Sequence, residues 1–460
     1  MDRRKFIKNM GLAAGSAFVL PRFSIAKNKS PNNMINLACV GVGGIGSMTF
    51  SGIGKGEANI VAICDVDTKY SAGNRKKFAP DAAFFEDYRV MLEKMGKDID
   101  AVCVSTPDHS HFKITMDAMQ CGKHVAVQKP LTHNVWQARE LAKARKYYKV
   151  QTQMMNQGHA TDSIRMLKEW YDSGVLGPVR EVYVMSTGPD WSSVYFKKPA
   201  SLPPPSSPVP DNLKWDLWLN QAKSVEFSQF YHPLTWRSFW EYGTGMLGDW
   251  FCHTGDAPVW CLDLKDPVSV ELLESDSSLD RNVLISNSSV VKWSFPATDK
   301  REAVDMYWYD GGKIPTKKPH DWPADRAFDF KGAMLMVGDK HTMETGSRPN
   351  FSPRMSNTEF FKEFRRNAPP KTIPRVRKDN LYFEWFDAIR GDGPECGSNF
   401  GYASQLTEVA LLGVLAQRLG GKIEWDAKNM VSPNRPEAAQ LIREPERAGW
   451  EVPPIPAAQV

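Results

Sequence analysis

The chain has 460 residues, of which 42% are hydrophobic, and it carries a formal net charge of +5. This length and composition indicate a globular protein of two domains. Residues 1–26 hold five basic residues and one acidic residue, so the net charge without them is +1, which argues against nucleic-acid binding. The seven cysteines lie mostly in apolar runs without C-x-x-C spacing, which argues against a disulfide framework or a metal site.

The first 26 residues have the features of an export signal. A basic start that includes Arg3 and Arg4 precedes an apolar stretch at residues 11–20 and a small-x-small site at residues 24–26. Paired arginines before such a stretch are typical of the twin-arginine export route. The apolar stretch is too short for a membrane span, which takes about twenty residues. We therefore expect a periplasmic protein with no membrane span in its mature form.

The stretch from Ile35 to Asp65 is typical of a dinucleotide-binding unit. An apolar strand is followed by GVGGIG at residues 41–46, a helix, and a second apolar strand that ends at Asp65. The glycines let the backbone approach a pyrophosphate, the helix N-terminus faces the phosphates, and the terminal acid binds a ribose hydroxyl. Asp65 would repel a 2′-phosphate, so NAD is favoured over NADP. The predicted cofactor-binding residues of this unit are Gly41, Gly43, Gly44, Ile45, Gly46 and Asp65.

Strands and helices continue to alternate up to residue 155, which predicts an α/β Rossmann domain with a doubly wound parallel sheet over residues 34–155. Helices are expected at residues 68–78, 88–95, 111–120 and 134–148, and strands at 100–105, 123–128 and 150–153. Ligands of such sheets bind beyond the carboxyl ends of the strands. The residues expected there, which complete the predicted NAD site, are Ser105, Thr106, Pro107, His109, His111, Gln128, Lys129, Asn156 and Gln157.

From residue 156 to residue 460 the pattern changes to that of an α+β domain. Alternating apolar residues predict antiparallel strands at residues 179–186, 268–273, 290–295 and 304–309. Helices are expected at residues 160–173, 246–262, 359–366, 380–390 and 405–419. A long irregular segment at residues 188–245 precedes the second of these helices, and loops of this length in a compact domain are usually functional.

Three residues are candidates for acid–base chemistry. Lys129 follows a strand that should border the nicotinamide, and Asp249 and His253 lie one turn apart on the expected helix at 246–262. A carboxylate in this position can orient an imidazole that acts as a general base for a hydroxyl. Other interpretations stay open: an ordinary strand-end lysine, a hydrogen-bonded helix without chemistry, and a metal site formed with Asp256. The scattered positions of the other histidines disfavour the metal site, so none is predicted.

Aromatic residues are concentrated in the segment at 188–245. They form either a core for an irregular segment or a wall of a carbohydrate site, where rings stack on the sugar and polar side chains bind its hydroxyls. In the second case the expected substrate contacts are Trp191, Tyr231, His232, Trp236 and Arg237, together with Lys129, Asp249 and His253.

These features together resemble the Gfo/Idh/MocA oxidoreductase family over essentially the whole mature chain. The resemblance implies that Lys129, Asp249 and His253 are the catalytic residues, although Gln128 stands where many members have Glu. It also implies a second domain with a large, mostly antiparallel open sheet, which often contributes to homo-oligomer contacts. The motifs that carry the resemblance are GVGGIG at 41–46, Thr106-Pro107 with His109 and His111, Lys129-Pro130, and Asp249 with His253 and Asp256.

A narrower resemblance is to the exported subgroup that is common in Bacteroidetes and Planctomycetes. It rests on the export signal together with QKPLTH at 128–133, NQGHA at 156–160, KWDLWL at 214–219, YGTGMLGDWFCH at 242–253, SNFGYASQLTE at 398–408 and IEWD at 423–426.

The family resemblance implies hydride transfer between a sugar, glycoside or polyol carbon and the nicotinamide of NAD, with His253 removing the hydroxyl proton. An alternative is a glycosidase or lyase that retains its NAD, oxidises a hydroxyl transiently, eliminates the aglycone and then reduces the product. A third alternative is a sugar-binding protein without turnover, against which the presence of Lys129, Asp249 and His253 argues.

Overall fold

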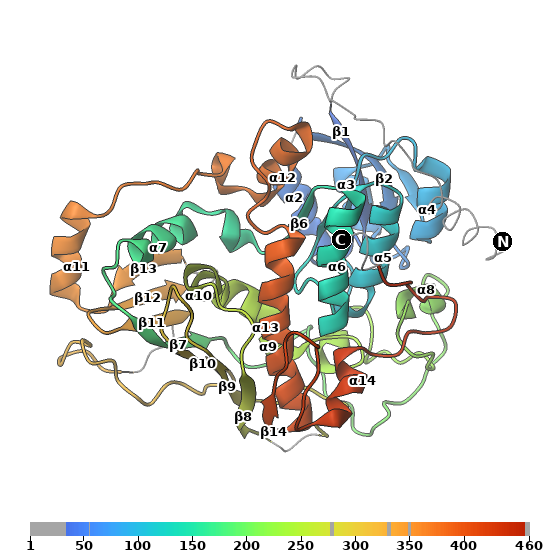
Figure 1. Cartoon of the computed structure of the whole chain (residues 1–460). Coiled ribbons are helices and arrows are strands. Elements are labelled where there is room, and N and C mark those ends of the chain that lie inside the picture. Colours follow the sequence, from blue (N-terminus) through green and yellow to red (C-terminus); the bar gives the residue numbers. More distant parts are fainter. Residues whose placement is uncertain (1–33, 55, 277–279, 329–332, 348–350, 456–460) are drawn as a thin grey trace.

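The fold is that of a computed structural model, which describes residues 34–54, 56–276, 280–328, 333–347 and 351–455. The predicted export signal at residues 1–26 lies outside these ranges. Figure 1 shows a nucleotide domain and a second domain with an open sheet. Helices α6 (Val135–Tyr148) and α13 (Phe400–Leu419) lie side by side where the two domains meet.

The nucleotide domain has a sheet of six parallel strands in the order β3-β2-β1-β4-β5-β6, which confirms the predicted doubly wound Rossmann fold. Its strands are β1 (Ile35–Val40), β2 (Ala58–Cys64), β3 (Ala83–Phe85), β4 (Ala101–Val104), β5 (His124–Val127) and β6 (Thr152–Met154). Besides α6, its helices are α2 (Gly46–Ile53), α3 (Ala72–Phe78), α4 (Tyr88–Met95) and α5 (Asp108–Gln120).

Both faces of this sheet are apolar and covered, as expected for parallel strands. Along β1, Leu37 and Cys39 face one apolar cluster, whereas Ala38 and Val40 face another. The first cluster includes residues of helix α12 (Leu381–Arg390), which comes from the C-terminal part of the chain. The nucleotide domain therefore depends on the second domain for part of its core.

The second domain has a sheet of eight strands in the order β13-β12-β11-β7-β10-β9-β8-β14. All neighbouring strands are antiparallel except β7 and β10, which are parallel to each other, and this confirms the predicted large, mostly antiparallel open sheet. The strands are β7 (Val179–Met185), β8 (Ser269–Ser275), β9 (Ser289–Phe295), β10 (Val304–Tyr309), β11 (Met334–Gly338), β12 (Thr342–Ser347), β13 (Phe351–Met355) and β14 (Gly421–Glu424).

The single helix expected at 246–262 is two helices, α9 (Gly245–Thr254) and α10 (Asp256–Leu262), with a break at Gly255. A Cβ atom built on Gly255 would lie 2.7 Å from ring carbons of Phe251, so only glycine fits at the break. The other helices and 3-10 turns are η2 (Gln157–Ala160), α7 (Asp162–Asp172), α8 (Trp215–Leu219), η3 (Thr235–Ser238), α11 (Thr358–Phe364), η4 (Arg365–Asn367), η5 (Arg377–Asp379), η6 (Pro436–Ala438) and α14 (Ala439–Ile442).

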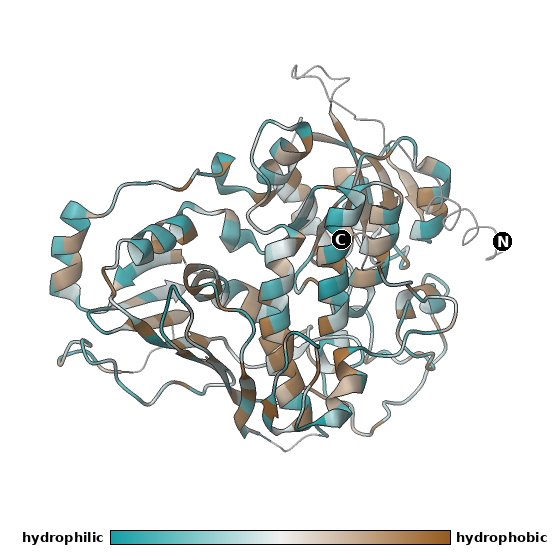
Figure 2. Ribbon diagram, viewed as in Figure 1, coloured by the Kyte–Doolittle hydropathy of each residue, from teal (hydrophilic) through white to brown (hydrophobic). Residues whose placement is uncertain are grey.

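Hydrophobic residues are concentrated in the strands of both sheets, as Figure 2 shows. Helix α13 is buried along most of its length and packs against α6 on one side and α9 and the second sheet on the other. Within the described ranges, no helix is long and apolar enough to span a bilayer.

Gly413 of α13 offers a test of this packing. A Cβ atom at this position would lie 2.3 Å from the fully buried Trp293 ring and 2.8 Å from Leu247. We expect Gly413→Ala to lower the free energy of unfolding by about 1–3 kcal/mol through overpacking, although alanine favours helix by about 1 kcal/mol. The control is Gly73→Ala in α3, where no atom lies within 4 Å of the new Cβ and stability should rise. Urea unfolding of both variants measures the two effects, and equal stabilisation would contradict the packing described.

Candidate active site

The glycine-rich turn after β1 forms a cradle that larger residues would fill. Gly41 has φ +76°, and a Cβ atom there would lie 2.7 Å from the carbonyl oxygen of Ser105. A Cβ atom on Gly46, the first residue of α2, would lie 2.3 Å from the carbonyl oxygen of Gly41. The turn therefore packs directly on the end of β4 and points the N-terminus of α2 toward the strand ends, where phosphates bind.

Asp65, at the end of β2, is joined to this turn. Its carboxylate accepts hydrogen bonds from the backbone amides of Val42 at 2.8 Å, Gly43 at 3.2 Å and Asp67 at 2.9 Å. Burial raises the pKa of Asp65, although these amides oppose the shift. Asp65 thus holds the glycine turn against β2, at the position where a ribose is expected.

A pocket lies along the carboxyl ends of the parallel strands. Eight of the predicted cofactor-binding residues line it: Gly41, Gly43, Gly44, Ile45, Asp65, Ser105, Thr106 and Pro107. The glycine cradle and the acid at the end of β2 lie together in one pocket, so these residues fit an NAD molecule, with its pyrophosphate at the turn and its adenosine ribose at Asp65.

Residues 212–237 of the long aromatic segment cover this pocket, and we call them the covering segment. The Thr68 amide donates to the Asn212 carbonyl at 3.0 Å, and the Lys214 amide donates to the Val66 carbonyl at 3.0 Å. The carboxylate of Asp67 bonds to His232 at 2.8 Å and accepts a hydrogen bond from the Asn212 side chain at 2.8 Å. The predicted substrate residue His232 therefore lies beside the cofactor pocket, next to the ribose end.

Lys129 and Asp249 meet at the end of β5. The Lys129 ammonium donates to both the carboxylate and the backbone carbonyl of Asp249, the latter at 3.0 Å. Burial opposes ionisation of Asp249, but the charges of Lys129 and Arg237 outweigh it and hold the pKa of this carboxyl below its ordinary value. The carboxylate predicted to orient His253 is thus ionised and engaged by Lys129.

His253 is buried one turn along α9 from Asp249, and its imidazole, when protonated, also lowers the pKa of that carboxyl. Its ring centroid lies 5.2 Å from that of Trp250. The structure therefore gathers the three predicted catalytic residues, Lys129, Asp249 and His253, around helix α9 beyond the carboxyl end of β5. All three lie outside the described pocket lining.

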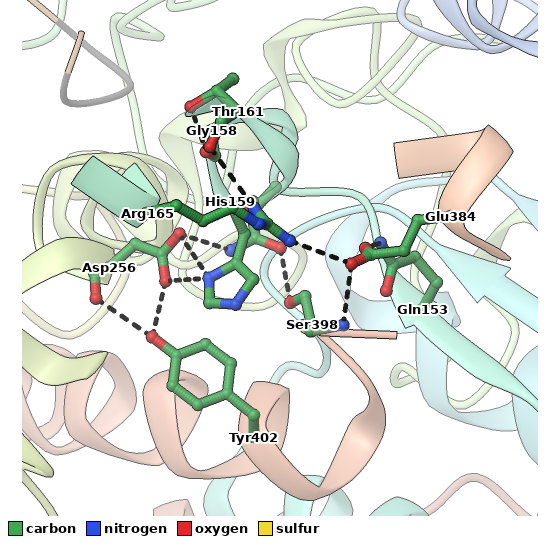
Figure 3. Close-up of polar contacts among 11 residues, drawn as sticks. Gln153, Gly158, His159, Thr161, Arg165, Asp256, Glu384, Ser398 and Tyr402 are labelled. Atoms are coloured by element: carbon green, nitrogen blue, oxygen red, sulfur yellow. Dashed lines mark hydrogen bonds and ion pairs between the residues drawn. The ribbon is translucent and has the colours of Figure 1, made fainter. Parts of the chain in front are cut away.

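Asp256 belongs to a different cluster, which Figure 3 shows. Its carboxylate bonds to His159 at 2.9 Å, accepts from Tyr402 at 2.6 Å, and accepts from the side-chain amide of Asn156 at 3.1 Å. Asn156 also accepts a hydrogen bond from Ser398 at 2.6 Å. The predicted cofactor residue Asn156 is therefore held between β6 and the second domain, and Gln157 follows it as the first residue of η2.

Three other predicted strand-end residues, His109, His111 and Gln128, contact neighbouring parts of the protein behind the pocket wall. His111 has one ring nitrogen 2.8 Å from the Thr106 carbonyl and the other 2.8 Å from the Pro130 carbonyl, so it spans the ends of β4 and β5. His109 bonds to the carbonyl of Trp218 at 2.9 Å, and burial lowers the pKa of its imidazole to about 3. The buried Gln128 amide contacts the sulfur of Met155 at 3.4 Å. These three side chains lie outside the described pocket lining.

The aromatic segment is largely its own core. Tyr231 packs against Trp215, Phe239 and Tyr242, with ring centroids 4.8–6.2 Å apart. Trp191 lies apart from this cluster, where its indole donates to Asn287 at 2.7 Å. Trp236 and Arg237 line the cofactor pocket. Of the five predicted substrate contacts in this segment, His232, Trp236 and Arg237 are therefore brought together, and Trp191 and Tyr231 lie outside the described lining.

Several pocket residues were not among the predicted site residues. Tyr70 packs on Gly43, where a Cβ atom would lie 2.3 Å from its ring. Leu217 and Trp218 come from α8, and Trp450 comes from the C-terminal segment. These positions become visible only when distant parts of the chain are brought together by the fold.

Helix α5 begins at Asp108, whereas the sequence predicts a start at residue 111. Pro107 precedes the first turn of α5, and the Asp108 carboxylate accepts from the amide and the hydroxyl of Thr244, at 3.2 and 2.8 Å, at the start of α9. Asp108 therefore joins the two domains and does not cap its own helix.

The Asp67 contact gives a prediction on stability and pH. Burial raises the pKa of Asp67, but hydrogen bonds from His232, the Tyr70 amide and Asn212 outweigh it and lower this pKa to about 2. The folded-state pKa is below the unfolded value of about 3.9. The contribution of Asp67 to the free energy of unfolding is therefore full above about pH 4 and is lost as the pH falls toward 2. The difference in unfolding free energy between the wild type and Asp67→Asn should therefore shrink over this range. Urea unfolding at several pH values measures it, and a difference that grows on acidification would contradict the assignment.

Comparisons with known proteins agree with this geometry. A protein-family model, described as the NAD-binding Rossmann fold of an oxidoreductase family, matches residues 35–156. The model of that family's C-terminal alpha/beta domain matches residues 160–292. D-glucoside 3-dehydrogenase of Escherichia coli (strain K12) is 28% identical over 161 residues, which are 34% of this chain and 44% of that protein. The chain thus spans less than half the length of this relative.

Solved structures show the same fold at low identity. The WlbA dehydrogenase from Chromobacterium violaceum, in complex with NADH and UDP-GlcNAcA, has a TM-score of 0.59 and 16% identity, with 87% of this chain and 98% of that chain covered. An inositol dehydrogenase homolog from Azotobacter vinelandii, complexed with NADH and myo-inositol, has a TM-score of 0.56 and 15% identity, with 85% and 98% covered. Because the two family models match both domains in order and together cover more than half of the sequence, the chain belongs to the Gfo/Idh/MocA family of NAD-binding oxidoreductases.

Proposed function

We propose that this protein transfers hydride between a hydroxyl-bearing carbon of a sugar, glycoside or polyol and the nicotinamide of NAD. The observation that carries the proposal is the contact of Lys129 with Asp249, one helical turn from His253. Asp249 is linked to the NAD pocket through Arg237, which lines the pocket and whose charge acts on the Asp249 carboxyl. A relative named D-glucoside 3-dehydrogenase and a neighbour crystallised with NADH and myo-inositol support this class of substrate.

The side chains have complementary tasks in this reaction. NAD, when bound, supplies the hydride acceptor. His253 removes the hydroxyl proton as the general base, since an imidazole takes up a proton near neutral pH. Lys129 donates a hydrogen bond to the same hydroxyl oxygen and stabilises the negative charge that develops there. Asp249 stays ionised beside Lys129 and holds the ammonium in place.

A redox-neutral glycosidase or lyase with a retained NAD is the second candidate. The covering segment and Trp450 enclose the pocket, which favours slow exchange of the cofactor. An enzyme that retains its NAD needs a reaction that restores the cofactor within each cycle. Transient oxidation of a hydroxyl, elimination of the aglycone and reduction of the product meet this requirement.

Purified protein distinguishes these candidates. Its NAD content is measured first, and NADH absorbance and aglycone release are then followed together on a panel of sugars and aryl glycosides. We expect NADH to rise with ketosugar formation. Aglycone release at constant bound NAD would contradict the dehydrogenase and support the redox-neutral enzyme. Ligand binding with neither signal would indicate a sugar-binding protein.

Alanine variants test the catalytic residues. Lys129→Ala and His253→Ala should each lower kcat by about a hundredfold to ten-thousandfold, the usual range for loss of acid–base catalysis. Lys168→Ala is the matched control, because Lys168 also pairs with an aspartate, Asp172, on a helix remote from the pocket. Full turnover by either catalytic variant on an identified substrate would contradict the proposed mechanism.

We also propose export by the twin-arginine route, on the basis of residues 1–26. Folded export fits a protein whose cofactor is loaded before it leaves the cytoplasm. In a fractionated host, mature protein should be found in the periplasm with its N-terminus after residue 26, and Arg3→Lys with Arg4→Lys should block its transfer. Retention of both forms in the cytoplasm would contradict the proposal.

Self-association through the open sheet completes the proposal. The sheet face away from the helices carries the half-buried Tyr307 and Tyr309. On the same sheet, Leu273 and Phe351 are exposed apolar residues. Apolar surface of this kind favours a homo-oligomer. The mass in solution, measured by light scattering, should exceed that of one chain, and a monomer at all concentrations would contradict this part of the proposal.

A further inference from the structure

Arg237 is a half-buried arginine held in one orientation by its neighbours. It lies on η3, where its guanidinium carbon is 4.2 Å from the ring centroid of Trp236 and 5.5 Å from that of Tyr195. Gly243 lets this turn pack closely, since a Cβ atom there would lie 3.1 Å from the Cα of Arg237. The aromatic contacts therefore fix the position of the charge without neutralising it.

The guanidinium has most of its donors available. Its recorded hydrogen bond, to the carbonyl of Leu234, is 3.3 Å long. Among the described residues, no carboxylate lies within ion-pair distance of Arg237, although most other arginines near the pocket or the domain junction have such a partner. A guanidinium carries five N–H donors in a planar fork that matches phosphate and carboxylate oxygens. Such a group, fixed in a pocket, is suited to bind an anion.

Its position points to the anion. Arg237 lines the same pocket as Gly43 and Gly44, and its neighbour Leu234 packs against Gly44, where a Cβ atom would lie 3.3 Å from the leucine methyl group. Its charge acts on Tyr70, which packs on the glycine turn, and on Asp249, which contacts Lys129. Arg237 therefore lies between the phosphate end of the pocket and the reacting centre.

We propose that Arg237 binds an anionic group in this pocket from the side opposite the glycine turn, and that this group is the pyrophosphate of the dinucleotide. The glycine turn and the N-terminus of α2 would then hold one side of the phosphates and a residue of the second domain the other. A carboxylate on the sugar has the same chemistry, and that source of the anion rests on the proposed function above.

Binding measurements on the full chain test this assignment without turnover. Arg237→Gln should weaken ADP-ribose and NAD by about tenfold to a hundredfold, the loss expected for charge-assisted hydrogen bonds. It should leave adenosine, which has no phosphate, unchanged. Arg237→Lys should lose less, because it keeps the charge and loses the fork. Arg443→Gln is the matched control, since Arg443 also stacks on a tryptophan, 4.0 Å from the Trp136 ring, and lies outside the pocket lining.

Each outcome decides the proposal. Unchanged ADP-ribose affinity with a KM that rises for a glucuronide relative to the matching glucoside would assign the anion to the substrate and keep the anion-binding role. Equal affinities of the wild type and Arg237→Gln for ADP-ribose, with no selective loss on the glucuronide, would overturn it. Equal weakening of adenosine and ADP-ribose by both variants would also overturn it, because it would indicate damage to the pocket. The ADP-ribose comparison holds even if no sugar substrate is found.

Discussion

The buried carboxylate of Asp256 is the constraint on which the arrangement of the two domains depends. Asn156 and His159 reach it from the end of the nucleotide domain, and Tyr402 reaches it from α13. A buried carboxylate is costly unless all its hydrogen bonds are made together. Asp256 follows the break at Gly255, so the same contacts fix where α9 ends and α10 begins. The contact of Lys129 with Asp249 follows from this arrangement, since it requires the end of β5 and helix α9 to keep fixed positions relative to each other.

A second group of charges extends this connection. Arg165 donates to the carbonyl of His159 at 2.6 Å and to Glu384 of α12 at 3.2 Å, and Gln153 of β6 donates to the same Glu384 carboxylate at 3.0 Å. Figure 3 shows that these contacts continue from the Asp256 cluster toward the nucleotide sheet. Helix α12, which covers one face of the nucleotide sheet, is thereby joined to α7, the first α-helix after that sheet. Neither domain has a complete core without the other.

The pocket has opposite charges at its two ends. Asp65, Glu86 and Asp87 line the adenosine end, whereas Arg237 lines the end nearer the reacting centre. An unmodified ribose with its free hydroxyls suits the acidic end, and the negative pyrophosphate suits the approach to the basic end. This asymmetry would favour a dinucleotide orientation that places the adenosine ribose at Asp65.

Local patterns were sufficient to predict the nucleotide domain, because its strands, the turn at Gly41 and the acid at Asp65 follow each other closely in the chain. They were also sufficient to place Asp249 and His253 one turn apart. The break at Gly255 was not predictable, because it depends on Phe251 packing against a backbone that has no side chain there. The pairing of His232 with Asp67 and the parallel pairing of β7 with β10 were missed for a related reason, since they join segments far apart in sequence.

The segment at residues 443–455 returns to the nucleotide domain. Trp450 lines the pocket, and the amide of Ile455 donates to Glu140 of α6 at 2.9 Å. Domains generally fold in the order in which the ribosome releases them, N-terminal first. The glycine turn therefore leaves the ribosome long before Trp450, although both line the same pocket. The pocket acquires its final shape only after the segment that holds Trp450 has been synthesised, and a nascent chain that stops before this segment would carry the glycine turn without that part of the pocket wall.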